Sequence, residues 1–583
     1  MSLTISAGQV AAFIANPTNF SGYSAGSYVK IVGAISHTQA SQLNAVNATY
    51  IEASVSETSI ANIAAIAVNN STRTSLNKFS FVVSDTTATA AALNSVVAKS
   101  SVAADFSKIT GITASDAASV KALYAATTVG LGSETVSIND TTVNAADLNT
   151  INAATDKKIT LSATSPTVAG LAADVKTLLV ADALNNTQLA GVTAAPITIT
   201  DSGAVSAADL VAIEANAATG FITVGTGATS LTGTRADITA VLAKDDVATQ
   251  TALGGGAVVT ISGTTPLDLT VTDTNITAAQ QKALTVLNTG KITATISDND
   301  ATELDKLTGT GHALTIVAND ASFPATKLSA YDAVTTLPVT FGTTFATITG
   351  TATDIINVLN SSGFGAFPSD LIINVNSGTT SVAQANILDA KTTGVVTATI
   401  SNGDMATLNT LTGTANDYTI TVTDSTLSSA EVVALDAKTV GDITINAATT
   451  FNGTLANAKK ILALGTANSG IVNATENEVF NITDTVVDTA ELAVVATDNA
   501  TGTSGNVNLT NVTTLTGEGG QIKAAFANAA VKLIPADVAV TIKESGGTID
   551  AQEISDIINS AGIAGGSAAF FCAGLSSCGF APP

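Results

Sequence analysis

Apolar residues recur along this 583-residue chain at a spacing of five and then three positions. In the clearest copy, an alternating segment at 136–138 runs into Asp140 and is followed by Val143, Leu148 and Ile151. One apolar residue followed by two that lie a helical turn apart is typical of a strand leading into a short helix. A unit of this size cannot bury a core alone, so the copies must stack on one another. The spacing occurs again at Ile5/Val10/Phe13, Val205/Leu210/Ile213, Leu427/Val432/Leu435, Val487/Leu492/Val495 and Ile549/Ile554/Ile557.

A polar residue follows the first apolar position of each copy, and an acid or amide stands three residues later. This order is typical of a capping box, in which the first side chain accepts a free helix amide and the second reaches back to the first residue. We therefore expect reciprocal caps in the pairs Ser6/Gln9, Asn144/Asp147, Ser206/Asp209, Thr277/Gln280, Ser428/Glu431, Asp488/Glu491 and Asp550/Glu553.

A second kind of unit alternates with the first and carries a glycine, with apolar residues at offsets of seven and three. We expect the glycine to permit a tight turn between strand and helix. Three residues past the cap position stand Asp174, Asp237, Asp354, Asn457 and Gln521. The copies are Val168/Val175/Leu178 with Gly170, Leu231/Ile238/Val241 with Gly233, Ile348/Ile355/Val358 with Gly350, Phe451/Ala458/Ile461 with Gly453, and Leu515/Ile522/Ala525 with Gly517.

A longer repeat relates residues 292–322 to residues 396–426 at an offset of 104, matching ITATIS with VTATIS. Alternation in the second copy puts Val396, Ala398 and Ile400 on one face of a strand and Thr397 and Thr399 on the other. Aromatic residues make up only 4% of the chain, and small aliphatic side chains suit a thin layered core. The sequence predicts an α/β fold: an elongated, β-rich repeat solenoid in which short strands form one long stacked sheet covered by short capped helices.

The regularity of the repeats divides the chain into three parts. Residues 1–130 hold less regular repeats, residues 131–559 form the strand-helix solenoid, and residues 560–583 are a tail rich in Gly, Ala and Phe. Three roles stay open for the tail: capping the solenoid end, docking into a neighbouring subunit, and acting as an export signal. It contains both cysteines of the chain, Cys572 and Cys578, which are a candidate disulfide.

The net charge of −24, from 46 acidic and 22 basic residues, argues against nucleic acid and anionic lipid as partners. No run of about 18 apolar residues is present, so we expect no membrane insertion and no cleaved leader. Because the repeat begins near residue 3, we expect export by a route that is read from the C-terminus, as in type I secretion.

The chain contains few residues suited to catalysis. Its two histidines, His37 and His312, belong to different repeats, which argues against a His-based triad or a multi-His metal site. Isolated acidic pairs are the remaining candidates for acid-base chemistry, but most of them coincide with the cap positions. We predict no catalytic residues and no enzyme activity.

Aspartates at equivalent strand ends are the candidate metal ligands. Asp140, Asp201, Asp273, Asp424 and Asp484 are candidates for calcium bound between subunits. The alternative is that these side chains form Asx turns, which aspartate does routinely. No EF-hand loop or calcium-binding nonapeptide is present, so the sequence predicts no required cofactor, with calcium as the one candidate ion.

The segments Ser230–Thr234 and Thr347–Thr351, the A-[DE]-L units and VTATIS resemble the strand-repeat regions of large secreted bacterial surface proteins, notably those of marine cyanobacteria. The bias to Ala, Thr, Val, Gly and Asp also resembles the composition of S-layer proteins. The resemblance implies an extracellular or cell-surface location and type I secretion. Members often carry calcium-binding nonapeptides, which this chain lacks.

Together these features predict a non-enzymatic structural protein that self-assembles, head to tail or in a lattice, into a bacterial surface layer or filament. The first alternative is an adhesin or fibre shaft whose threonine face binds cell-surface glycans. The second is a repeat enzyme that acts on polysaccharide.

Overall fold

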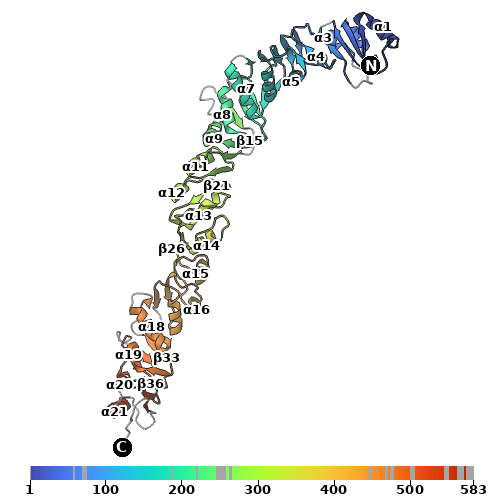
Figure 1. The fold of residues 1–583 in the computed structure, drawn as a ribbon. Coiled ribbons are helices and arrows are strands. Elements are labelled where there is room, and N and C mark those ends of the chain that lie inside the picture. Colours follow the sequence, from blue (N-terminus) through green and yellow to red (C-terminus); the bar gives the residue numbers. More distant parts are fainter. Residues whose placement is uncertain are drawn as a thin grey trace. The chain divides into compact units, whose positions relative to one another are not determined.

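The structure is a computed structural model that describes residues 2–56, 59–67, 75–185, 188–217, 221–244, 258–261, 266–445, 450–466, 471–472, 478–498, 506–543, 551–560 and 570–572. The chain is a mixed α/β protein whose strands pair in parallel. It divides into two compact units, Met1–Thr295 and Ile296–Pro583, which are described separately (Figure 1).

Most strands of the first unit are short and pair with equivalent strands of the next repeat. They form one sheet of β1 (Ser2–Ser6), β2 (Ser27–Ile35), β3 (Ala48–Val55) and β4 (Lys78–Ser80); one of β5 (Thr87–Thr89), β7 (Gly111–Ser115), β9 (Thr135–Ile138), β11 (Ile159–Leu161) and β13 (Leu189–Ala190); one of β10 (Thr142–Asn144), β12 (Thr167–Gly170), β14 (Ile197–Ile199), β16 (Phe221–Val224) and β18 (Val258–Ile261); one that includes β15 (Gly203–Ser206), β17 (Ala228–Gly233), β19 (Asp268–Val271) and β20 (Ile292–Thr295); and the pair β6 (Ala104–Asp105) and β8 (Thr128–Val129).

The second unit repeats this organisation. Its strands are β21 (Ala313–Thr315); the pair β22 (Val317–Ala318) and β24 (Thr340–Phe341); a sheet of β23 (Ser322–Pro324), β25 (Thr347–Gly350), β26 (Ile372–Val375), β27 (Val396–Thr399), β28 (Asp417–Val422), β30 (Ile443–Ile445) and β32 (Ile471–Val472); a sheet of β29 (Thr426–Ser428), β31 (Thr450–Gly453), β33 (Val479–Ile482), β35 (Asn506–Asn508) and β37 (Val531–Lys532); and a sheet of β34 (Val486–Asp488), β36 (Thr514–Gly517), β38 (Ala539–Ile542) and β39 (Phe570–Cys572).

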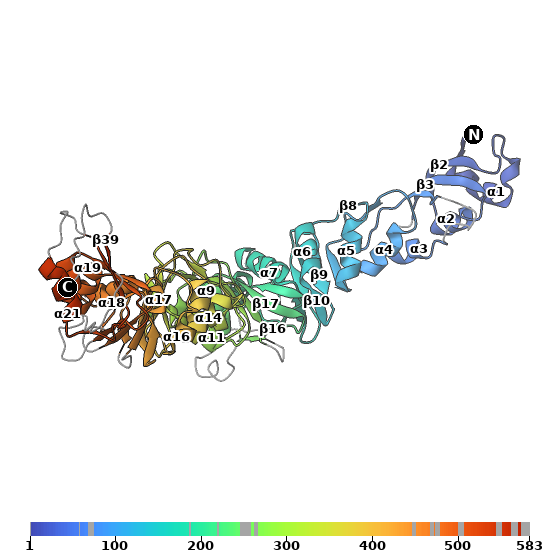
Figure 2. The same cartoon turned by 90° about the horizontal axis from the view of Figure 1, so that it is seen from below.

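Helices follow the strands of most repeats and pack against the helix of the next one, as α4, α5 and α6 do in Figure 2. In the first unit they are η1 (Ala7–Gln9), α1 (Val10–Ala15), η2 (Pro17–Asn19), α2 (His37–Leu43), α3 (Ile60–Ala64), α4 (Ala90–Val97), α5 (Ala117–Ala125), α6 (Ala145–Ala154), α7 (Ala172–Asn185), α8 (Ala207–Asn216), α9 (Arg235–Leu242) and α11 (Ala278–Leu287). In the second they are α12 (Ala301–Leu304), α13 (Ala325–Val334), α14 (Ala352–Asn360), α15 (Val382–Asp389), α16 (Met405–Leu408), α17 (Ser429–Asp436), α18 (Leu455–Thr466), α19 (Thr489–Asp498), α20 (Gly519–Ala527) and α21 (Ala551–Ser560).

The prediction of one long sheet is wrong. The described strands form several sheets, because in some repeats a turn such as 139–141 separates two strand segments. The segments then pair separately, so that β9 lies next to β11 while β10 lies next to β12. Strands and helices both recur throughout the described residues, so the fold is mixed α/β.

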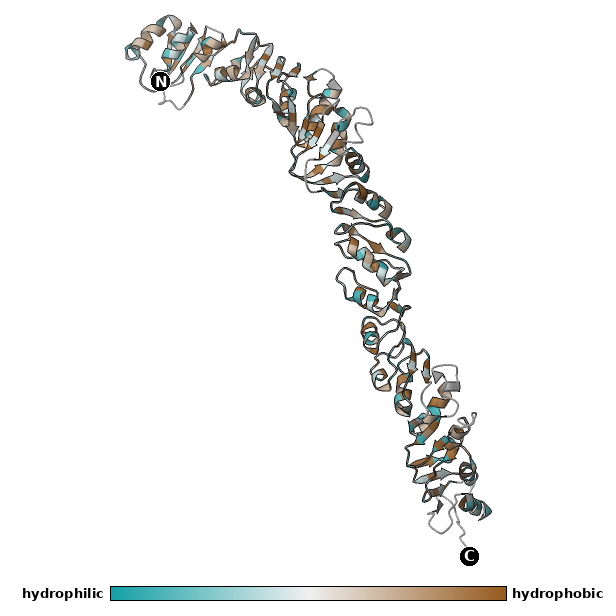
Figure 3. Ribbon diagram, turned by 180° about the vertical axis from the view of Figure 1, so that it is seen from behind, coloured by the Kyte–Doolittle hydropathy of each residue, from teal (hydrophilic) through white to brown (hydrophobic). Residues whose placement is uncertain are grey.

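The predicted apolar repeat is confirmed as the core. Val143, Leu148 and Ile151 are at most 1% exposed, and the described members of the other five-then-three copies are buried, apart from the half-buried Ile554. Every apolar position of the five glycine-bearing units is buried as well. Figure 3 shows the same pattern, with hydrophobic residues along the strands and hydrophilic residues on parts of the helices. Ile549 lies outside the described residues.

The 104-residue repeat is confirmed in structure. Strands β20 and β27 share one burial pattern, in which Val396, Ala398 and Ile400 are buried while Thr397 and Thr399 are not. Helices α12 and α16 begin at residues 301 and 405, which keeps the same offset.

The structure can be compared with the predicted division of the chain at residue 130 and in the tail. The sheet that contains β7 and β9 continues from one side of residue 130 to the other. In the tail, β39 pairs in parallel with β38, and Cys572 lies opposite Ile542. Cys578 lies outside the described residues, so the disulfide stays a prediction.

Candidate functional site: the junctions between repeats

The five predicted calcium ligands each accept a hydrogen bond from the helix of the preceding repeat. In each case a carboxylate Oδ2 accepts the first backbone amide of that helix. The donors are the amides of Ala117 to Asp140 (2.7 Å), Ala172 to Asp201 (2.8 Å), Arg235 to Asp273 (2.5 Å), Met405 to Asp424 (2.8 Å) and Leu455 to Asp484 (2.6 Å).

The two caps of such a helix have separate tasks. The residue before α5, Asp116, accepts the amide of Ser119 at 2.7 Å, whereas Asp140 of the next repeat accepts the amide of Ala117. An N-cap side chain reaches the second or third helical amide, so the first amide needs an acceptor from elsewhere. A carboxylate at this place is also stabilised by the positive end of the helix dipole.

Sequence reasoning missed further members of this set among the described residues. Asp85 and Asp320 accept the first amides of α3 and α12, at 2.7 and 2.8 Å. Asn402 does the same for α15 at 3.0 Å. The two aspartates could have been found from the sequence. Each lies five residues before the first residue of the following helix, as Asp140 does.

The structure does not gather the candidate ligands into one site. Each of the five aspartates belongs to a different repeat, and no group of three or more His, Cys, Asp or Glu in the described ranges is arranged to hold a metal ion. Calcium binding by these residues stays a prediction.

Asp201→Ala should lower the free energy of unfolding by about 1–2 kcal/mol, because the first amide of α7 loses its acceptor. Urea denaturation of the full chain would measure the change, with protection of the Ala172 amide from hydrogen exchange as the local readout. Asp156→Ala is the matched control, since the side chain of Asp156 is 62% exposed and, among the described residues, forms an ion pair only with the neighbouring Lys157. Equal effects of both variants would contradict the capping role.

Reciprocal capping boxes form where the third helical residue is glutamine. Gln9, Gln39, Gln280, Gln384 and Gln521 each accept the amide of their own cap residue. The predicted boxes at Asp147 and Asp209 do not form, and Ser428, three residues before Glu431, makes no cap hydrogen bond through its side chain. Asp147, Asp209 and Glu491 pair with Lys121, Lys176 and Lys459 of the preceding helix. A carboxylate gains more from an ammonium group than from a neutral amide, and it ties successive helices together. Asp550 lies outside the described residues.

The recurring glycines are needed for close approach more than for turns. A Cβ at Gly170 would lie 2.9 Å from the Cβ of Ala145, and one at Gly233 would lie 2.8 Å from that of Ala207. Both alanines open the helix of the preceding repeat. Only Gly350 and Gly517 of the five have a positive φ, so the predicted role in a turn applies to these two alone.

Side chains on the strands form a further kind of junction. Asn481 Nδ2 donates to Asn452 Oδ1, and Asn508 Nδ2 donates to Asn481 Oδ1, both at 2.8 Å. The three residues are in register on β31, β33 and β35. Each asparagine inside such a ladder satisfies a donor and an acceptor without solvent, which links three repeats.

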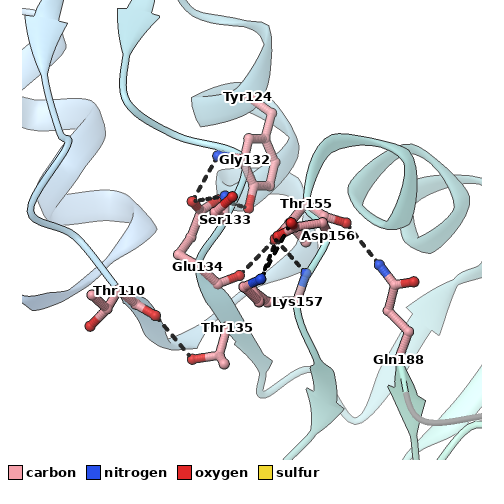
Figure 4. A network of polar contacts seen from close by, with 10 residues as sticks. All are labelled: Thr110, Tyr124, Gly132, Ser133, Glu134, Thr135, Thr155, Asp156, Lys157 and Gln188. Carbon is pink, nitrogen blue, oxygen red and sulfur yellow. Dashed lines mark hydrogen bonds and ion pairs between the residues drawn. The ribbon is translucent and has the colours of Figure 1, made fainter.

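A buried carboxylate organises one junction of the first unit (Figure 4). Glu134 is 0% exposed and accepts the amides of Gly132 (2.7 Å) and Ser133 (3.0 Å) and the hydroxyl of Tyr124. Thr155 Oγ1 of the next repeat donates to the Glu134 backbone carbonyl at 2.7 Å. Burial, together with the bond to Glu134, raises the pKa of Tyr124. The network joins the two repeats.

The two histidines lie in different units. His37 is the first residue of α2, and His312, only 2% exposed, lies just before β21. Burial lowers the pKa of His312. The prediction of no catalytic residues stays a prediction.

The N-cap Asp116 gives the stability of the first unit a pH dependence. Hydrogen bonds from the Ser119 side chain and amide lower the pKa of Asp116 below its ordinary value. Its stabilising effect is therefore complete above the unfolded pKa of about 3.9 and is lost as the pH falls through the folded pKa. We expect the difference in unfolding free energy between wild type and Asp116→Asn to shrink below about pH 4. Urea titrations from pH 7 to pH 3 would measure it, and a difference independent of pH would contradict the assignment.

Among the described residues, every helix is too short or too polar to span a lipid bilayer. A scan against protein-family models finds no match for this chain, and no curated protein matches it.

Proposed function

We propose that this protein is a structural component of a bacterial surface, an elongated solenoid of stacked repeats that assembles into a filament or layer. The observation that carries the proposal is the use of its acidic residues: recurring aspartates accept the first helix amide of the preceding repeat. Acidic side chains fixed in this way stiffen a repeat array, which is a mechanical role.

The other junctions support the same function. Parallel strands in register, an asparagine ladder and lysine-carboxylate pairs between helices all join one repeat to the next. A protein of this kind works outside the cell or on its surface, and we propose that it is exported by a type I route. Such repeats favour head-to-tail or lattice contacts between copies.

Electron microscopy and sedimentation of the purified full chain would test this function. We expect ordered filaments or sheets to appear as the protein concentration rises. The experiment has one arm with calcium and one with a chelator, and assembly only in the first would support the aspartates as calcium ligands. Monodisperse monomers in both arms at every concentration would overturn the proposal.

A glycan-binding fibre shaft is the second candidate function. Thr198, Thr223 and Thr260 are half-buried and in register on β14, β16 and β18, so their hydroxyls form a row on one face of a sheet. Sugar hydroxyls bind to such rows through hydrogen bonds. Binding of the soluble monomer to a glycan array, lost on changing all three threonines to valine, would favour this function over assembly.

A further inference from the structure

The outward face of the first sheet differs from the threonine and asparagine rows described above. It carries Tyr28 and Lys30 on β2, Tyr50 and Glu52 on β3, and Lys78 on β4, which we call the N-terminal sheet face. Tyr28 is in register with Tyr50, and Glu52 is in register with both Lys30 and Lys78. Tyrosine is among the residues that contribute most to binding at protein interfaces.

The side chains of this face are held in place before any partner arrives. The ring centroids of Tyr28 and Tyr50 are 4.5 Å apart, and Lys78 Nζ lies 4.3 Å from the centroid of Tyr50. Glu52 accepts the hydroxyl of Tyr28 and pairs with Lys30 Nζ at 3.0 Å. Long side chains that are already ordered lose little conformational entropy on binding, so this face suits docking.

Charge is distributed unevenly along the chain. Residues 1–130 contain six basic and five acidic residues, for a net charge of +1. Residues 131–583 contain 16 basic and 41 acidic residues, for a net charge of −25. Two copies of the acidic part repel each other, whereas the first part of one copy is not repelled by the acidic part of another.

We propose that the N-terminal sheet face docks on the acidic part of a second copy of this chain, an inference that rests on the proposed self-assembly. The lysines steer the two copies together, and the paired tyrosines supply the apolar contact area. Because the attraction is between exposed charges, it weakens as salt rises above physiological strength.

Two variants of the full chain test this interface. Lys30→Glu/Lys78→Glu reverses the charges of the face, and Tyr28→Thr/Tyr50→Thr gives it the threonines of the other sheets, which keep strand propensity. We expect each to raise the protein concentration needed for assembly by about tenfold or more. Lys391→Glu/Lys460→Glu is the matched control, because it changes the net charge equally at two exposed lysines of the acidic part. Thermal melting checks that all variants are folded.

The outcomes separate the interface from the proposed function. Assembly of wild type and control with loss in both face variants supports the interface. Unchanged assembly of the folded face variants overturns it and leaves the structural function standing. Absence of assembly in wild type overturns both. In a further arm, polygalacturonate is added to the chain below its assembly concentration. If wild type and control bind it, the face variants do not, and all of them assemble equally well, then the face is a site for an anionic glycan instead.

Discussion

Gly290→Ala should lower the free energy of unfolding by about 3 kcal/mol, at the upper end of the cost of overpacking. A Cβ on Gly290 would lie 2.1 Å from the backbone carbonyl oxygen of Leu267 in the preceding repeat. That oxygen also accepts the side-chain amide of Asn288 at 2.6 Å, so it has little freedom to move. Urea denaturation would give the loss, and hydrogen exchange at the amides of β19 and β20 would place it at this junction.

Two further glycines make this prediction specific. Gly394 stands 104 residues later, and a Cβ there would lie 2.4 Å from the carbonyl oxygen of Asp370, so Gly394→Ala should cost a similar amount. Gly8 has no atom closer than 3.9 Å to such a Cβ, and Gly8→Ala should be neutral or stabilise the chain by up to about 1 kcal/mol. Equal unfolding free energies for all three variants would show that close approach does not govern these positions.

Glu134→Ala should also cost about 3 kcal/mol, because it leaves two partly buried amide hydrogen bonds and the Tyr124 hydroxyl without their acceptor. The loss is measured by urea denaturation, with hydrogen exchange at the amides of Gly132 and Ser133 as the local readout. Glu134→Gln retains an acceptor oxygen and should cost less.

Tyr124→Phe is the control for the Glu134 network. It removes one donor and keeps the ring, so it should cost about 1 kcal/mol. A cost for Glu134→Ala no larger than that of Tyr124→Phe would contradict the role of Glu134 as the centre of the network.

The sequence predicted the core far better than the sheets. Apolar spacing identified Val143, Leu148 and Ile151 as buried, since burial follows directly from strand and helix periodicity. The division into several sheets was missed, because it depends on where a turn such as 139–141 splits a strand, and spacing carries no information about pairing partners.

The sequence pointed to the junction residues but did not predict which groups they contact. Asp140 and its equivalents stood out in the sequence because they recur at strand ends, yet their hydrogen-bond donors lie 19 to 38 residues earlier. A local capping rule explains Gln280, whose partner is Thr277, but not Asp209, whose partner is Lys176 of another helix. Contacts between repeats depend on how the units stack, which no single repeat encodes.

The aspartate caps also fix the order in which the two partners of each hydrogen bond are synthesised. Each of the five first helix amides precedes, in the chain, the carboxylate that accepts it. During synthesis, a helix therefore leaves the ribosome before the residue that completes its cap. The cap of each helix is therefore complete only after the next repeat has been synthesised. If the chain is exported from its C-terminus, as proposed above, this order is reversed, and each carboxylate leaves the cell before the helix that it caps.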